Sequence, residues 1–196
     1  IEVNLAGTRH AAEAVARVAE RAALTPPGTW IIGGHWNQNA WPDHQFPTAA
    51  PLDVAVPDHP VLLWAHSKHA VWVNSLALRR AGVDAATPDP DGGTIARDGA
   101  DDATGMLFEN AIRLVADLAL DETAGGPAER AAFVRVAREL VARGLTTVCD
   151  IEGAHELRLL QDLRRTGELP LRVRCYLPVW QLDAARATSS RATRTN

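Results

Sequence analysis

The fold class is indicated most clearly by the run Gly144-Leu145-Thr146-Thr147-Val148-Cys149-Asp150. A glycine that ends a helix, followed by branched apolar residues, is typical of a buried strand. Before this run, Pro127 favours the start of a helix, because the first position of a helix does not use its backbone N–H. Residues 154–165 predict a second helix, and residues 171–177 predict a second strand. Helix and strand alternate in steps of about 25 residues, which favours a parallel α/β fold, either a barrel or a doubly wound sheet.

The part of the chain before residue 127 lacks this regular alternation. Residues 37–59 contain four prolines and predict a loop, and residues 87–93 predict a turn. The other expected elements are a helix over 8–24 with Thr8 as N-cap, strands over 30–34 and 61–65, a short helix from Asn74 to Ala81 closed by Gly82, and a helix over 104–120 capped by Thr104.

The composition limits the class of protein. The chain has 196 residues, which is enough for a core but short of the ~250 residues of a complete (β/α)8 barrel. Its net charge of −4 gives no basic surface for nucleic acid or an anionic membrane. No apolar run approaches the ~20 residues of a membrane span. Two cysteines make no disulfide framework, so a cytoplasmic location is the default expectation.

Tryptophan, histidine, asparagine and glycine are concentrated between residues 30 and 110. Large aromatic side chains and imidazoles among loop residues suit the wall of a pocket. Each tryptophan can equally belong to the core, since indole rings bury a large apolar area. The tryptophans for which both alternatives stay open are Trp30, Trp36, Trp41, Trp64 and Trp72.

Several polar side chains are candidates for chemistry. His66 and His69 would point to opposite faces of a strand, whereas in a loop they can face one ligand. Metal ligation, substrate contact and structural hydrogen bonding are open for both. Asp150 ends a strand, where parallel α/β folds place active sites, but it can also order the following helix. Glu109 is either a pocket residue or a favourable charge near a helix start, and Asn74 is either a cap or a ligand contact.

These motifs, in their order and spacing, resemble the YtcJ-like branch of the amidohydrolase superfamily, amidohydrolase family 3. The resemblance covers roughly residues 5–180. The motifs that carry it are Trp30–Trp36, Pro60–Ser75, Ala77–Val83, Pro90–Gly93, Thr104–Glu109 and Gly144–Asp150.

The resemblance implies a metal-binding TIM barrel that hydrolyses carbon–nitrogen bonds in amides, formamides or related compounds. It also implies one or two divalent metal ions, usually zinc, that activate water. The family's His-x-His pair has no counterpart in this sequence, and its later metal ligands would lie beyond Asn196. We therefore expect an α/β fragment: a partial TIM (β/α)8 barrel with a mixed α/β insertion, truncated at both ends.

We expect three parts. Residues 1–126 contain the first helix of the barrel region and the Trp/His-rich insertion, residues 127–183 contain the βα units of a partial barrel, and residues 184–196 form a disordered or non-native tail. Asp150 is the catalytic candidate, and the substrate-binding candidates are Trp36, His66, His69, Asn74 and Glu109. We expect no metal ligands in this chain, zinc in the full-length enzyme, and an amide-type small molecule as substrate. The alternative is a non-catalytic binding module. Open sheet edges of a partial barrel leave homo-oligomer formation open.

Overall fold

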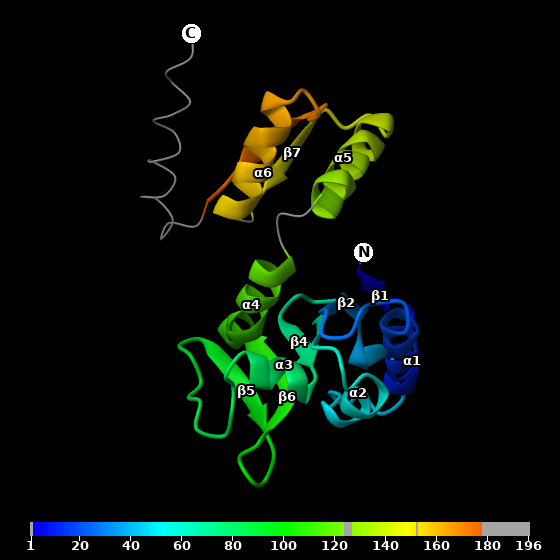
Figure 1. The fold of residues 1–196 in the computed structure, drawn as a ribbon, viewed down its shortest axis with the longest axis vertical. Coiled ribbons are helices and arrows are strands. Elements are labelled where there is room, and N and C mark those ends of the chain that lie inside the picture. The colour runs from blue at the N-terminus through cyan, green and yellow to red at the C-terminus, as the bar shows by residue number, and fades with distance from the viewer. Residues whose placement is uncertain (1, 124–126, 152, 178–196) are drawn as a thin grey trace. The chain divides into compact units, whose positions relative to one another are not determined.

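The computed structural model describes residues 2–123, 127–151 and 153–177 of a mixed α/β fold (Figure 1). The chain divides into two compact units, residues 1–123 and residues 124–196. The domain boundary expected from the sequence falls three residues later, at 126/127. The expected tail, residues 184–196, lies outside the described residues. Within the described part, no helix is both long and apolar enough to cross a bilayer.

Unit 1 is built on a six-stranded mixed sheet with the order β1-β2-β3-β4-β6-β5. The first three strands in this order pair in parallel, and the remaining pairs are antiparallel. Figure 1 shows the strands side by side, from β1 near the N-terminus to β5. The strands are β1 Val3–Asn4, β2 Ile31–Trp36, β3 Val61–Ala65, β4 Ala70–Val73, β5 Gly93–Arg97 and β6 Ala103–Glu109.

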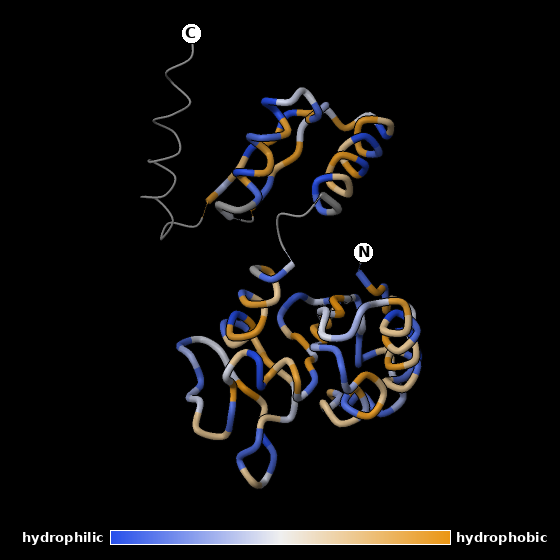
Figure 2. Tube along the Cα trace, viewed as in Figure 1, coloured by the Kyte–Doolittle hydropathy of each residue, from blue (hydrophilic) through white to orange (hydrophobic). Residues whose placement is uncertain are grey.

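Both faces of this sheet are covered by helices. The helices of unit 1 are α1 Ala11–Ala22, α2 Ala50–Ala55, α3 Ser75–Arg80 and α4 Arg113–Thr123, with 3-10 turns at Gln38–Ala40 and Asn110–Ile112. Helices α1 and α2 share one buried cluster with Leu63 and Trp72, whereas α3 and α4 share another with Leu62 and Val71. Neighbouring strand residues thus enter opposite cores, as the two-residue period of a strand requires. Figure 2 shows hydrophobic stretches among the strands and helices of unit 1, interrupted by hydrophilic residues.

The prediction of a helix over residues 104–120 is wrong for the first half of this range. Residues 103–109 form strand β6, and the helix begins only at Arg113. Met106 and Leu107 enter the two different cores, which is strand rather than helix periodicity. Thr104 is no N-cap, because it lies inside β6 and its hydroxyl donates to the Ala96 oxygen at 3.1 Å. Tertiary pairing with β4 and β5 therefore overrides the local helical pattern.

The structure also differs from other local expectations. Helix α1 is capped by His10, whose Nδ1 accepts from the Glu13 N–H, and not by Thr8. The hydroxyl of Thr8 is buried and donates to the Leu5 carbonyl oxygen. The expected loop over 37–59 contains helix α2, and strands β4 and β5 were not predicted. The predictions of strand 61–65 and of the cap at Asn74 are confirmed.

Unit 2 contains α5 Pro127–Ala142, β7 Thr147–Asp150, α6 Ala154–Arg165 and β8 Arg172–Cys175. Strands β7 and β8 pair in parallel, so the predicted alternation of helix and strand is confirmed. Two parallel strands do not by themselves distinguish a barrel from a doubly wound sheet. The apolar run around Cys149 favours a buried thiol, but the structure corrects this expectation, because Cys149 is exposed.

Arg130 ties the two helices of unit 2 together. Its guanidinium donates to Glu168 at 2.6 Å, to Asp162 at 3.2 Å and to the Thr166 hydroxyl at 2.7 Å. The hydrogen bond from Arg130 lowers the pKa of Glu168, and Arg165, followed by Arg130, lowers the pKa of Asp162. Because the folded-state pKa values are lowered, these pairs stabilise the fold at neutral pH and lose that contribution in acid.

We predict that Gly105→Ala destabilises unit 1 by at least about 2 kcal/mol. Gly105 has a φ of 99°, and an added Cβ would lie 2.6 Å from the Val73 oxygen and 2.8 Å from the Ala49 nitrogen. Urea unfolding monitored by tryptophan fluorescence measures the effect. Gly99→Ala is the matched control, because no heavy atom lies within 4 Å of its added Cβ. Equal stability of the two variants would contradict the close packing at Gly105.

We predict that Arg130→Met accelerates hydrogen exchange of the α5 and α6 amides at neutral pH, and that this difference shrinks on acidification. The pKa values of Glu168 and Asp162 are both lowered in the folded state, so the carboxylate contributions are present at neutral pH and are lost as the pH falls below the ordinary carboxyl range and both groups accept protons. Arg135→Met is the control, since among the described residues Arg135 pairs with Glu139 of its own helix. An Arg130 effect that does not depend on pH would contradict the ion-pair explanation.

Candidate functional site

Polar side chains gather at one end of the unit 1 sheet. Strands β2 and β6 end there, at Trp36 and Glu109, and residues 66–69 form the turn that joins β3 to β4. Backbone hydrogen bonds fix the turn: the His66 N–H donates to the Trp36 oxygen at 2.8 Å, and the Glu109 N–H donates to the His69 oxygen at 3.2 Å. The topology thus brings together His66, His69 and Glu109, three of the residues selected from the sequence.

His69 and Glu109 make the central contact of this site. Nδ1 of His69 lies 3.0 Å from Oε1 and 3.1 Å from Oε2 of Glu109, across 40 residues of sequence. The two side chains are 71% and 57% exposed, so solvent screens the charge–charge part of the interaction. The contact therefore orients the imidazole ring more than it stabilises the fold.

His35, Lys68 and Trp64 complete the site. The rings of His35 and His66 have centroids 6.4 Å apart and are tilted by 58°. The Lys68 ammonium lies 5.4 Å from the centre of the half-buried Trp64 ring, within cation–π range. Sequence reasoning missed His35, because it ended the strand at Gly34 and left His35 outside. The register irregularity between Gly34 and Trp36 is what places His35 on this edge.

The backbone at this end of the sheet is strained. His35, Lys68 and Glu109 have φ values of 72°, 66° and 51°, in the left-handed region that favours glycine. Glu109 combines this φ with a ψ of −126°, a pairing that turns normally assign to glycine. Each such residue costs about 1–3 kcal/mol, and strain of this kind concentrates at functional sites.

Trp36 and Asn74, two further residues selected from the sequence, lie in the core. Trp36 stacks on Trp41 at 5.8 Å, and its indole N–H donates to the Leu63 oxygen. Asn74 caps α3: its Oδ1 accepts from the Val61 and Ala77 N–H groups, and its amide donates to the His59 oxygen. Both side chains are fully buried within unit 1. A contact of either residue with substrate stays a prediction.

Asp150, the catalytic candidate, belongs to unit 2. It ends β7, as expected, and its register partner on β8 is Cys175. Burial raises the pKa of the Cys175 thiol, and the neighbouring Asp150 carboxylate raises this pKa further. The catalytic role of Asp150 stays a prediction.

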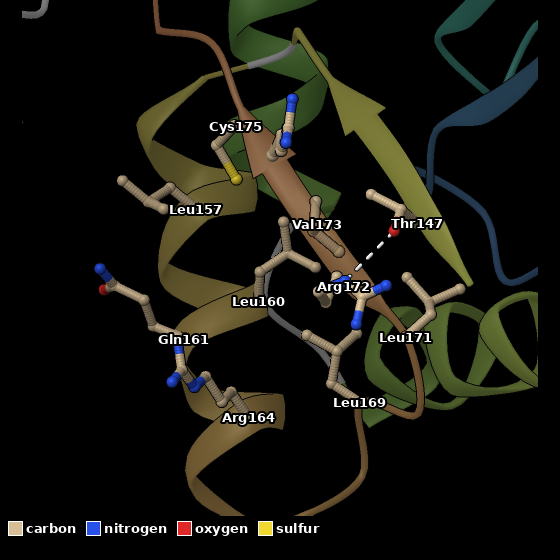
Figure 3. Close-up of a pocket in the computed structure, with 11 residues that line it drawn as sticks. Thr147, Leu157, Leu160, Gln161, Arg164, Leu169, Leu171, Arg172, Val173 and Cys175 are labelled. Atoms are coloured by element: carbon tan, nitrogen blue, oxygen red, sulfur yellow. Dashed lines mark hydrogen bonds between the residues drawn. The ribbon is translucent and has the colours of Figure 1, made fainter.

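Unit 2 also has an open cavity of about 760 Å³ between α6 and β8 (Figure 3). Leu157 and Leu160 of α6 face it from one side, and Leu171 and Val173 from the other. Arg172 lies at its edge and donates to the Thr147 hydroxyl at 3.3 Å. Apolar side chains around so open a space are typical of a surface that further protein covers.

The described residues do not form a metal centre. Among residues 2–123, 127–151 and 153–177, no three side chains of histidine, cysteine, aspartate or glutamate converge as a set of metal ligands. The His69–Glu109 pair and the His35–His66 pair thus each fall short of a ligand set, since protein metal sites use three or more ligands.

Comparison with known proteins relates the whole chain to one family. The model of the Amidohydrolase family matches residues 2–195. The chain is 44% identical, over 49% of its length, to the Bacillus subtilis protein YtcJ, which its name places among the amidohydrolases. It is 35% identical to Protein LONG AFTER FAR-RED 3 of Arabidopsis thaliana and 32% identical to the N-substituted formamide deformylase of Arthrobacter pascens. These two matches cover 76% and 74% of the chain.

Two solved structures are also similar. An uncharacterized metal-dependent hydrolase from Pyrococcus furiosus matches 95% of the chain with a TM-score of 0.62 and 25% identity. A metal-dependent hydrolase from Pyrococcus horikoshii shares the fold with a TM-score of 0.66. The chain covers 36% and 35% of these two proteins, and 18%, 25% and 27% of the three curated relatives. It therefore spans a minor part of the length of each relative.

We predict that Asn74→Ala destabilises unit 1 by about 2–4 kcal/mol, because it leaves buried N–H and C=O groups without partners and removes a helix cap. Chemical unfolding measures the change. Asn37→Ala is the matched control: Asn37 also caps a helical turn, but it is exposed, and its loss costs below about 1 kcal/mol. An Asn74 variant of unchanged stability would contradict a structural role for this amide.

Proposed function

The chain belongs to the amidohydrolase family, and on that premise we propose that it is part of a metal-dependent hydrolase that cleaves carbon–nitrogen bonds other than peptide bonds. The His69–Glu109 pair, held on a strained sheet end beside His66, is the observation that carries the assignment of the substrate side. The formamide deformylase among the relatives supports an amide or formamide as the substrate class.

The side chains have distinct proposed roles. His66, His69 and Glu109 are exposed and supply hydrogen bonds to the substrate. Trp36 and Asn74 are buried and have supporting roles. The Trp36 indole packs in the core and supports the end of β2, and Asn74 caps the first turn of α3, which follows β4. We propose Asp150, at the carboxyl end of a parallel strand, as a catalytic residue of the complete enzyme.

The family and its solved relatives imply a divalent metal ion, and we propose zinc. At least part of its ligand set would come from residues other than the described ones, because no three potential ligand side chains converge there. We also propose that β7 and β8 are two strands of a (β/α)8 barrel. The parallel pairing, and the open cavity of mixed polar and apolar lining beside β8, support this proposal.

Expression of this chain together with the sequence that flanks it in the genome tests the function. We predict that the longer protein, loaded with zinc, hydrolyses N-substituted formamides or simple amides. In it, His69→Ala and Glu109→Gln should each lower kcat/KM at least about tenfold, equivalent to about 1.4 kcal/mol of transition-state stabilisation. Glu20→Gln is the control for Glu109, because Glu20 is an exposed carboxylate on α1.

Two results would contradict this assignment. Variants of His69 and Glu109 that keep wild-type kcat/KM would remove the sheet end from the substrate site. A longer protein that binds amides but neither binds metal nor hydrolyses them would support the alternative, a non-catalytic binding module.

A further inference from the structure

We propose that Glu109 is a positioning residue that fixes the tautomer of His69, so that Nε2 is presented as a hydrogen-bond acceptor to a ligand N–H or O–H group. The assignment of Nε2 to an amide substrate rests on the proposed function. The tautomer itself follows from the structure of unit 1 alone.

The geometry of the pair determines which imidazole nitrogen carries the proton. Both carboxylate oxygens of Glu109 lie within 3.1 Å of Nδ1 of His69. An ionised carboxylate can only accept, so Nδ1 must donate its hydrogen, and the neutral ring then keeps a lone pair on Nε2. Within the described part of the chain, no hydrogen bond reaches Nε2, and the side chain is 71% exposed. The acceptor therefore faces solvent.

The backbone at Glu109 shows that this carboxylate is held in place. Its φ of 51° and ψ of −126° suit glycine, yet neighbouring contacts impose them. The Glu109 N–H donates to the His69 oxygen, and the Asn110 side chain donates to the Asp91 oxygen at 2.7 Å. Gly93 lies so close to Ala111 that an added Cβ would overlap its nitrogen. The turn after β6 is thus locked, and glutamate occupies a position where glycine would be unstrained.

The chemistry of the pair selects the kind of ligand. A carboxylate behind the imidazole disfavours an anion in front of it, whereas an acceptor nitrogen favours a neutral N–H donor. An amide or formamide N–H is such a donor. The side chains of His35, His66 and Lys68, at the same end of the sheet, carry N–H donors of the kind that a carbonyl oxygen accepts.

Nitrogen-15 NMR of the histidine rings tests the tautomer in the present chain, at about pH 8.5, where ordinary imidazoles are neutral. We expect His69 as the Nδ1–H tautomer, and a shift toward Nε2–H in Glu109→Ala. His10 is the internal reference, because its Nδ1 accepts from the Glu13 N–H and must lack a proton. His10 should show Nε2–H in both proteins. His69 as Nε2–H in the unmodified chain would overturn the proposal.

A thermal unfolding comparison tests the strain separately. Glu109→Gly should melt at a higher temperature than Glu109→Ala, because glycine adopts this φ and ψ without a Cβ clash. An alanine variant that melts at or above the glycine variant would overturn the claim that the backbone here is strained. Both variants lose the carboxylate, so loss of the His69 contact cannot explain a difference between them.

The tautomer and the proposed hydrolysis can fail independently. If NMR shows Nδ1–H on His69 while the longer protein hydrolyses no amide, the positioning role holds and the proposed substrate is wrong. If the longer protein is active while His69 is Nε2–H, the hydrolase assignment holds and Glu109 does not position His69.

Discussion

The structure of unit 1 depends on a sheet that is buried on both faces. Neighbouring residues of β3, β4 and β6 enter different cores, one shared with α1 and α2 and the other with α3 and α4. Fully burying one large apolar side chain contributes about 1.5–3 kcal/mol, so the summed contribution fixes both register and strand order. The central strands β3 and β4 consist of apolar residues, and the polar side chains of the 66–69 turn and Glu109 lie at the strand ends.

This arrangement explains how a strained backbone persists at the site. His35 lies at the irregularity within β2, and the turns at Lys68 and Glu109 each connect to a strand whose register the two cores fix. Relaxing one turn would shift a strand by a residue and expose its apolar side chains on the wrong face. The cores therefore stabilise the conformations that bring His69 and Glu109 together, although neither residue contributes much to stability itself.

Much of unit 2 could be predicted from the sequence, because its elements are local. Proline and glycine mark the ends of α5, and the expected bounds of α6 agree with the structure. Strand β6 could not be predicted, because its apolar residues continue at helical spacing into α4, and only pairing with β4 and β5 decides between the two. The residue types of His66, His69 and Glu109 indicated a site, but their contact depends on strand order. His35 depends on a bulge that no local pattern revealed.

We propose above all that the polar end of the unit 1 sheet faces the substrate of a metal-dependent hydrolase. A crystal structure of the longer protein with a bound, slowly hydrolysed formamide would show which residues contact the substrate. We predict that the formamide N–H lies within hydrogen-bonding distance of His69 Nε2, with His66 and Glu109 beside it. A ligand held entirely by other residues, with this end of the sheet facing open solvent, would contradict the claim.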